Sequence, residues 1–293
     1  MQLIDGKEAS NAIRNQIKSK VAQLIDAGER APHLAAVLVG EDPASQTYVA
    51  SKEKSCQKVG ITSTLYRLPE KTTQDELLGV IDFINQDEDI DGVIVQLPLP
   101  GHIDKDTIIQ AISPAKDVDG FHPINVGKMV AGLPTYLPAT PLGIMMLLEH
   151  YGIETSGKHC VVLGRSNIVG TPISIMLSRK SEPGNATVTM LHSRSQNIQE
   201  IISEADIVIA ALGKPLFLKA DMVKKDAVII DVGIHRVPSE KTKSGFRLVG
   251  DVDFDEVAKK ASWITPVPGG VGPMTITGLL VNTMKAYEKE VYP

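Results

Sequence analysis

The stretch HCVVLGRSNIVGTPISIML (159–177) decides the fold expected for this chain of 293 residues. It opens with a short apolar run that ends in Gly164, which is typical of a buried parallel strand. A helical pattern follows, with Gly170 in its first turns. A strand that turns through glycine directly into a helix is the layout of a dinucleotide site. Glycines let the backbone approach a pyrophosphate, and the helix N-terminus attracts its negative charge.

The same turn also permits a plainer interpretation. Five residues separate Gly164 from Gly170, so the usual G-x-G-x-x-G pattern is absent, and so is the G-K-[ST] ending of a P-loop. A tight strand-to-helix turn that binds no ligand therefore stays open on this stretch alone.

The end of the next strand bears on the choice of cofactor. The expected strand 186–192 runs into HSRS (192–195), where an NAD site would carry an acidic residue for the ribose 2′-hydroxyl. Hydroxyls and a cation suit a 2′-phosphate instead, and Arg165 can add a second cation. The residues favour NADP over NAD, although Arg194 taken alone can also belong to a solvated basic turn.

The first half of the chain alternates strands and helices. We expect strands at 33–40, 61–69 and 91–100, separated by helices at 43–59, 73–87 and 104–112. That order implies a parallel sheet with helices on both faces, because parallel strands need crossover connections. The Pro- and Gly-rich segment 114–130 is expected to form a loop without regular structure.

A second set of strands follows a proline-rich loop near residue 140. We expect them at 159–164, 186–192, 205–212, 227–234 and 247–254. The chain is therefore expected to be α/β, with two three-layer α/β domains. One comprises residues 1–140 plus 276–293, whose last helix packs back on it, and the other, residues 141–275, has a Rossmann-like parallel sheet.

Composition excludes several classes of function. Net charge is −5 with acidic and basic residues interspersed, so no basic arm argues for nucleic acid. The N-terminus has no secretory pattern, and no apolar stretch approaches the ~18 residues that span a membrane. Cys56 and Cys160 stand far apart and form no ligand pair. We expect no disulfide and no metal site, and a cytoplasmic location.

The helix expected at 43–59 carries a lysine in an unusual place. Asp42 and Pro43 are start signals, and Gly60 is a stop signal. Lys52 falls in the middle of the less polar face, which consists of Tyr48, Val49, Cys56 and Val59. Its amine can snorkel to solvent. Alternatively it points inward, where a partly buried lysine beside a tyrosine can serve as a base.

Seven stretches that span nearly the whole chain resemble, in order, the bifunctional methylenetetrahydrofolate dehydrogenase/cyclohydrolase family. They are YVASKEKSCQKVGI (48–61), VQLPLP (95–100), PAKDVDGFHPINVGK (114–128), GRSNIVGTP (164–172), DVGI (231–234), GDVDF (250–254) and TPVPGGVGPMT (265–275). This resemblance is far more specific than a single glycine loop. It implies a folate and cofactor cleft between the two domains.

The resemblance also implies a catalytic group in the first domain. Tyr48 and Lys52, four residues apart on one helix face, match the family's central pair. Gln96 matches its strand-end glutamine, and Asp119 matches the second acid of KDVDG. Without the family, Gln96 can bond to its own loop, and Asp119 can close an Asx-turn before Gly120. By contrast, Asp117 is expected to be structural.

Further positions follow from the same match. Substrate-binding residues are expected to be Leu97, Pro98, Pro268 and Gly269, together with Tyr48, Lys52, Gln96 and Asp119. Cofactor-binding residues are expected to be Gly164, Arg165, Ser166, Ile168, Val169, His192, Ser193, Ile234 and Thr275. The glycine loop 265–275 also admits a plain turn between a strand and a helix. One departure from the family is Ala139, where cysteine is common, a change expected to tune binding.

The resemblance implies two reactions of one-carbon metabolism. NADP oxidises 5,10-methylenetetrahydrofolate to the methenyl cation, and water then converts the cation to 10-formyltetrahydrofolate. Lys52 is the implied base, Gln96 orients it, Tyr48 bonds to it and packs on the folate, and Asp119 anchors the pterin. The family is homodimeric, so a homodimer is expected.

Two other classes of function stay open on the sequence. An NADP oxidoreductase acting on a small hydroxy acid needs a cationic site in the first domain, where the evident arginines are Arg14, Arg30 and Arg67. A non-catalytic folate-binding scaffold would not need to retain the implied catalytic residues. We expect no formyltetrahydrofolate synthetase activity, because no segment is long enough for a ligase domain.

Overall fold

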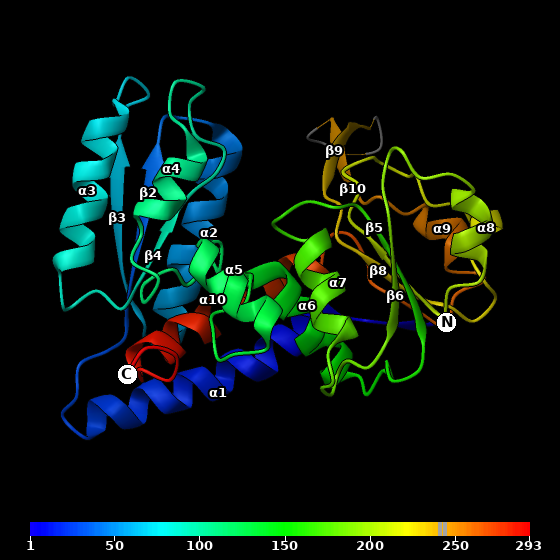
Figure 1. Ribbon diagram of the computed structural model, residues 1–293, viewed down its shortest axis with the longest axis horizontal. Helices are drawn as coiled ribbons and strands as arrows, with labels where there is room; N and C mark the ends of the chain where they lie inside the picture. Colours follow the sequence, from blue (N-terminus) through cyan, green and yellow to red (C-terminus); the bar gives the residue numbers. More distant parts are fainter. Residues whose placement is uncertain (240–241, 243–244) are drawn as a thin grey trace. The chain divides into compact units, whose positions relative to one another are not determined.

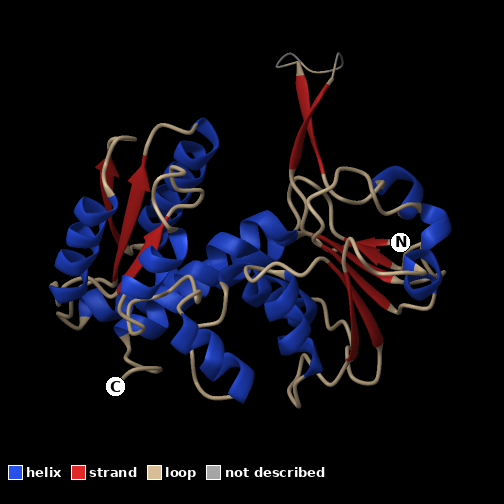
Figure 2. Cartoon of the chain, turned by 45° about the horizontal axis from the view of Figure 1, so that its top comes forward, coloured by secondary structure: helices blue, strands red, loops and turns tan. Residues whose placement is uncertain are grey.

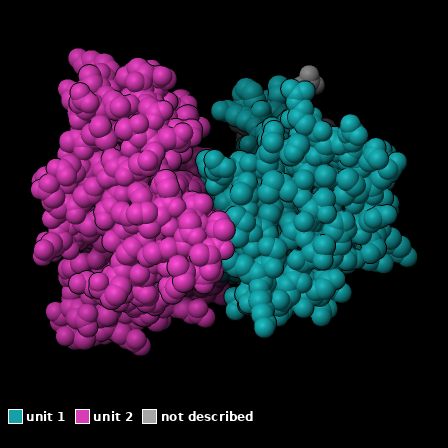
Figure 3. Space-filling model, in the orientation of Figure 1, with its two compact units in different colours: residues 1–11, 140–275 teal, residues 12–139, 276–293 magenta. Residues whose placement is uncertain are grey.

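The chain folds into two units, each assembled from segments that are distant in sequence (Figure 3). The computed structural model describes residues 1–239, 242 and 245–293. Unit 1 comprises residues 1–11 and 140–275, and unit 2 comprises residues 12–139 and 276–293. Within the part of the chain that is described, no helix combines the length and apolarity needed to cross a bilayer.

Unit 1 is built on a six-stranded sheet in which every pairing is parallel, as predicted. Its strands, in spatial order, are β1 (Gln2–Leu3), β11 (Trp263–Ile264), β8 (Val228–Asp231), β7 (Ile207–Ala210), β5 (His159–Leu163) and β6 (Thr187–Leu191). The chain passes from β5 to β6 on one side and then crosses to β7 on the other. The carboxyl ends of β5 and β7 therefore flank a topological switch point, where ligands of such sheets bind.

Helices cover this sheet on both faces (Figure 1). They are α6 (Ala139–His150), α7 (Gly170–Ser178), α8 (Ile198–Ser203), η1 (Ala220–Met222) and α9 (Phe254–Val257). The core beneath α8 and α9 is aliphatic, with Ile202 and Val257 packed against strand residues such as Val208 and Ile229. The layout confirms the expected Rossmann-like α/β architecture.

The first eleven residues differ from the expected division, which placed them with residues 12–140. β1 pairs with β11, so that Gln2 lies beside Trp263 and Leu3 beside Ile264. Gly6 then packs against the backbone of Gly270, whose carbonyl oxygen lies only 1.7 Å from where a β-carbon would stand. A two-residue strand held by tertiary contacts leaves no periodic signal in the sequence.

The strand expected at 247–254 coincides with β10 (Phe246–Val249) only over residues 247–249, and β10 lies outside the parallel sheet. It pairs antiparallel with β9 (His235–Pro238), in register from Phe246↔Pro238 to Val249↔His235. The two strands form a ribbon that projects from unit 1 (Figure 2). The residues after Val249 turn back to the sheet.

Unit 2 has a three-stranded parallel sheet in the order β3-β2-β4, as predicted. Its strands are β2 (His33–Val39), β3 (Thr62–Leu68) and β4 (Gly92–Val95), and its helices are α2 (Pro43–Val59), α3 (Gln74–Gln86), α4 (Lys105–Ala111) and α5 (Pro123–Ala131). Most of α1 (Gly6–Asp26) and α10 (Val271–Tyr287) also belongs to unit 2, although the first residues of both helices belong to unit 1. One core joins the sheet to α1, α2 and α10, and a second core joins it to α3 and α4. Ala139 is buried in the first of these cores.

The helix ends show where start and stop signals in the sequence, such as capping residues, proline and glycine, were interpreted correctly and where they were not. Asp42 caps α2 by accepting a hydrogen bond from the Ser45 N–H at 2.7 Å, and Gly60 ends the helix with φ of 84°. The expected loop at 114–130 was wrong in its second half, because α5 occupies it. His122 caps that helix, and Pro123 takes its first position. Proline and glycine mark helix ends here rather than loop.

Candidate functional site

Lys52 lies on α2 and points toward the carboxyl end of the unit 2 sheet. Its Nζ donates a hydrogen bond to Oε1 of Gln96 at 3.2 Å. Gln96 follows β4 directly, and its own Nε2 donates to the Leu97 carbonyl at 2.6 Å. Because the oxygen and the nitrogen of the Gln96 side-chain amide are both hydrogen-bonded, the oxygen is held toward Lys52. This contact favours the inward interpretation of Lys52 over snorkelling.

Asp119 lies near the same lysine. The ammonium of Lys52 lowers the pKa of the Asp119 carboxyl, but burial raises it more strongly, and the net direction is upward. Asp117 pairs with Val93 in an isolated parallel bridge, so the chain runs alongside β4 and brings Asp119 level with the end of that strand. Within the described residues, the Asp119 carboxylate accepts no protein hydrogen bond and remains available to a ligand.

Asp117, two residues earlier, has a different environment. It is 1% exposed, and its carboxylate accepts hydrogen bonds from the N–H groups of Phe121 (3.2 Å) and His122 (2.8 Å) and from Nδ2 of Asn125 (2.8 Å). Burial nevertheless raises the pKa of Asp117 to about 6. Asp117 holds the loop together, as expected of a structural residue.

Tyr48 differs from the sequence expectation in its exposure. We expected it on the inward, less polar face of α2, but its side chain is 44% exposed. The buried face of α2 consists instead of Ser45, Val49, Ser55, Cys56 and Val59. The exposed ring stands one helical turn from Lys52, so a planar ligand that reaches the amine can lie against the ring. Leu97 and Pro98, partly buried and exposed respectively, follow Gln96.

The two glycines of the stretch 159–177 are required first by the protein's own packing. Gly164 has φ of 119°, and a β-carbon on it would lie 2.2 Å from the Ala211 carbonyl oxygen. A β-carbon on Gly170 would lie 2.2 Å from the Gly164 carbonyl oxygen. They allow the turn to lie against the end of β7 and α7 to begin against the turn. Ser166 Oγ accepts hydrogen bonds from the Val169 and Gly170 N–H groups at 3.1 and 3.4 Å.

The turns after β5 and β6 lie on neighbouring strands, since Leu163 pairs with Leu191. The turn after β6 is closed by its own bonds: His192 N–H donates to Ser195 Oγ at 3.0 Å, and Arg194 N–H donates to His192 Nδ1 at 3.2 Å. Arg165 and Ser193 are both exposed. A guanidinium and a hydroxyl on adjacent strand ends, with no acidic residue on the turn after β6, fit an NADP 2′-phosphate.

The other expected binding residues of unit 1 lie in its loops. Ile168 and Ile234 are exposed apolar side chains after β5 and β8, and Val169 is partly buried at the start of α7. Thr275 shares a hydrogen bond with the Thr140 hydroxyl at 3.0 Å. Pro268 and Gly269 lie between β11 and α10, where Gly269 has φ of 112°. The loop at this point is therefore a glycine turn before a helix, and its ligand role stays a prediction.

Two buried carboxylates, Asp231 and Asp251, were assigned no role from the sequence. Both accept hydrogen bonds from backbone N–H groups at the carboxyl end of the unit 1 sheet. The available signal was a glycine within two residues of each, in D-V-G (231–233) and in G-D-V (250–252). Each glycine leaves room for the oxygens of the other aspartate, Gly250 for those of Asp231 and Gly233 for those of Asp251.

Neither thiol is placed for chemistry. Cys56 and Cys160 are free and buried, and burial raises the pKa of each to about 12. Among the described residues, no group of three or more His, Cys, Asp and Glu side chains could hold a metal ion.

Comparisons with known proteins agree on one family. The sequence model described as "Tetrahydrofolate dehydrogenase/cyclohydrolase, catalytic domain" matches residues 4–119, and that of the family's NAD(P)-binding domain matches residues 138–291. The chain is 61% identical over 286 residues to the bifunctional protein FolD of Cytophaga hutchinsonii, covering 98% of this chain and 99% of that protein.

Solved structures extend the likeness to the whole fold. The bifunctional enzyme FolD of Campylobacter jejuni is 49% identical, with a TM-score of 0.93 and 99% of both chains covered. The methylenetetrahydrofolate dehydrogenase-cyclohydrolase of Trypanosoma brucei, complexed with NADP and an inhibitor, is 38% identical. Its TM-score is 0.92, with 99% of this chain and 98% of that chain covered.

Proposed function

The chain belongs to the tetrahydrofolate dehydrogenase/cyclohydrolase family, and we propose that Lys52, Gln96 and Asp119 of unit 2 carry its chemistry. The enzyme oxidises 5,10-methylenetetrahydrofolate with NADP to the 5,10-methenyl compound, which it then hydrolyses to 10-formyltetrahydrofolate. The observation that carries the residue assignment is the hydrogen bond from Lys52 Nζ to Gln96 Oε1. Asp119 lies close enough to Lys52 for the lysine charge to lower the pKa of the carboxyl, against the larger effect of burial. Neither a hydroxy-acid dehydrogenase nor a non-catalytic scaffold fits this membership.

Unit 1 binds the cofactor. NADP supplies the acceptor for the hydride that leaves the methylene carbon of the folate. Arg165 and Ser193 are proposed to hold the 2′-phosphate, because both are exposed on the turns that follow two adjacent strands. The other residues proposed to line the cofactor are Gly164, Ser166, Ile168, Val169, His192, Ile234 and Thr275. The chain's contribution to this step is orientation, since holding the reactants in place lowers the entropic part of the barrier.

The hydrolytic step requires proton transfer, and Lys52 is the proposed base. Water attacks the methenyl carbon as Lys52, acting as the base, takes one proton from the water, which gives a neutral carbinolamine. Lys52 returns that proton to N5 as the bond from the carbon to N5 breaks. The remaining hydroxyl proton leaves to solvent, so that a formyl group is left on N10. Gln96 Oε1 accepts a hydrogen bond from one N–H of Lys52. This bond orients the amine for proton transfer to and from the substrate.

Asp119 and Tyr48 are proposed to bind the folate ring. The 2-amino group and ring N–H of a pterin form a donor pair that a carboxylate accepts, and the Asp119 carboxylate has no protein donor among the described residues. The exposed ring of Tyr48 offers an apolar surface to the folate. Leu97, Pro98, Pro268 and Gly269 are proposed to make further substrate contacts.

We also propose a homodimer in a reducing cytoplasm. The β9–β10 ribbon exposes Phe246 and Leu248, which are 41% and 44% exposed, and such an edge can pair with a second copy. Two free, buried cysteines are consistent with a reducing compartment. Sedimentation of the purified protein tests the dimer.

One spectrophotometric assay tests the main proposal. Methylenetetrahydrofolate is mixed with the enzyme and either NADP or NAD, and the appearance and decay of the methenyl compound are followed. We expect rapid formation with NADP, weaker formation with NAD, and decay that depends on the enzyme. If the enzyme reduces neither NADP nor NAD, the proposal is contradicted.

A further inference from the structure

Asp251 joins two loops at the carboxyl end of the unit 1 sheet. It is fully buried, and its Oδ2 accepts hydrogen bonds from the N–H groups of Leu212 at 2.6 Å and Gly213 at 2.9 Å, just after β7. Its Oδ1 lies 2.7 Å from Nε2 of His235, the first residue of β9. One carboxylate thus holds the loop after β7 to the segment after β8.

Asp231, the last residue of β8, makes the reciprocal connection. Its Oδ1 accepts hydrogen bonds from the N–H groups of Gly233 at 3.0 Å and Asp251 at 2.9 Å, and its Oδ2 accepts one from the Val252 N–H at 3.0 Å. It is 3% exposed. Each aspartate therefore anchors the loop from which the other comes. We call Asp231, Asp251 and His235 the carboxylate clasp.

Glycines make the clasp possible. A β-carbon on Gly250 would lie 1.8 Å from an Asp231 oxygen, and one on Gly233 would lie 2.4 Å from an Asp251 oxygen. Between the clasped Gly233 and His235 stands Ile234, whose side chain is 43% exposed. The loop after β7 also contains Ala211, whose carbonyl meets Gly164. The clasp thus controls both the loop that presents Ile234 and the wall against which the Gly164 turn lies.

We propose that the carboxylate clasp is a positioning device for the cofactor: Asp231, Asp251 and His235 set the loops after β7 and β8 in the conformation that binds NADP. The inference rests on the proposed cofactor site of unit 1. None of the three residues need touch the cofactor, and none takes part in the hydrolytic step, which uses residues of unit 2. Loss of the clasp should therefore weaken NADP binding and leave cyclohydrolase activity in place.

The test compares Asp251→Asn with Asp253→Asn, two residues further along. Asparagine keeps the shape of Asp251, but its amide donors then face N–H groups, whereas Asp253 pairs with Lys219 outside the clasp. We expect Asp251→Asn to raise the KM for NADP about tenfold or more. The Kd of the enzyme for NADP, measured by equilibrium dialysis, should rise by a similar factor. The rate of methenyltetrahydrofolate hydrolysis without cofactor should stay within about twofold, and Asp253→Asn should change neither.

His235→Ala is the second variant. The histidine is at the edge of the clasp and partly exposed, so its loss leaves the two buried backbone contacts of Asp251 intact. We expect a smaller rise in the KM for NADP, with kcat nearly unchanged. An unchanged Kd for NADP in both variants would overturn the proposal, and so would equal losses of NADP binding and hydrolysis in His235→Ala. Dialysis against NADP needs no folate, so this result is independent of the substrate assignment.

Discussion

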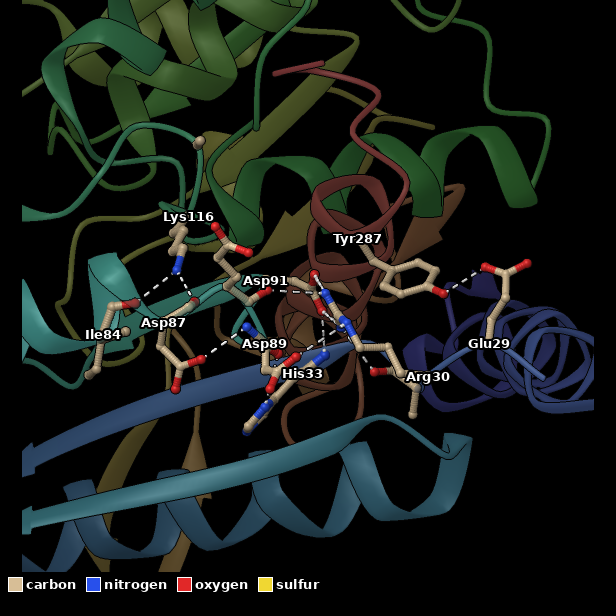
Figure 4. A network of polar contacts seen from close by, with 12 residues as sticks. Glu29, Arg30, His33, Ile84, Asp87, Asp89, Asp91, Lys116 and Tyr287 are labelled. Atoms are coloured by element: carbon tan, nitrogen blue, oxygen red, sulfur yellow. Dashed lines mark hydrogen bonds and ion pairs between the residues drawn. The ribbon is translucent and has the colours of Figure 1, made fainter.

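The two ends of the unit 2 sheet both carry basic and acidic side chains, but these side chains make many hydrogen bonds within the protein at the amino end and few at the carboxyl end. At the amino end, Arg30 donates two hydrogen bonds to the Asp91 carboxylate, at 2.8 and 2.7 Å, and lies over the Tyr287 ring (Figure 4). Lys116 there donates to the Ile84 carbonyl at 2.8 Å and also to that of Asp87, near the end of α3. At the carboxyl end, Lys52 and Gln96 share one side-chain hydrogen bond beside Asp119.

The difference separates charged groups that stabilise the fold from charged groups that are available to a ligand. At the amino end the hydrogen-bonding capacity of the charged groups is used within the protein, so those groups stabilise the fold and offer little to a ligand. At the carboxyl end an amine and a carboxylate retain unused capacity in partly buried positions, which costs stability unless a ligand completes the contacts. Substitutions should therefore affect activity at one end and stability at the other.

The largest effect is expected from Lys52→Met. Methionine keeps the length and most of the volume of the side chain but removes the base, so cyclohydrolase activity should fall about 10²–10⁴-fold. The melting temperature should remain near that of the wild type, because a single side-chain hydrogen bond is lost. Lys54→Met, on the exposed side of the same helix, is the control and should keep both activities. Wild-type hydrolysis by a folded Lys52→Met variant would refute the assignment.

Asp119→Asn and Asp117→Asn should separate the two roles within one loop. Asp119→Asn should weaken folate binding about tenfold, measured as KM in the dehydrogenase reaction, with little change in stability. Asp117→Asn should instead lower the free energy of unfolding by about 1–3 kcal/mol, because its amide would face donors that now meet a carboxylate. Urea denaturation of both variants decides the matter. A stability loss in the Asp119 variant equal to that in the Asp117 variant would contradict this division.

Much of this arrangement could be predicted from the sequence, because local chemistry dictates it. The parallel strands, the Asp42 cap and the Gly60 stop follow from residue preferences that tertiary contacts did not override. The contact of Lys52 with Gln96 required two segments to meet, and only the family resemblance pointed to it before the structure did.

What could not be predicted depends on tertiary partners. Tyr48 has the apolarity of a buried residue, but the elements packed on α2 leave it exposed. The first eleven residues join unit 1 through a strand too short to show a period. The clasp of Asp231 and Asp251 needs a bridge between loops that neither local sequence reveals.

The pH dependence of folate binding should report the Asp119 environment. Burial raises the pKa of Asp119 and the Lys52 ammonium lowers it, with burial the larger effect. As pH falls, the carboxylate should therefore take up a proton, and the KM for methylenetetrahydrofolate should rise, at a higher pH than for an ordinary aspartate. In Lys52→Met the opposing charge is gone, so the rise should begin at still higher pH. An unchanged pH profile in that variant would show that the two groups are not coupled.

The smallest effect is expected at the amino end, from Arg30→Met. The Arg30–Asp91 pair has good two-bond geometry, but the arginine side chain is 42% exposed, and solvent screens such pairs. The free energy of unfolding should fall by no more than about 1 kcal/mol, and by less at high salt. The kcat and KM values of both reactions should be those of the wild type, because Arg30 lies at the end of the sheet opposite Lys52. A change in KM for the folate without a change in stability would mean that charge at the amino end reaches the site, and the contrast between the two ends would fail.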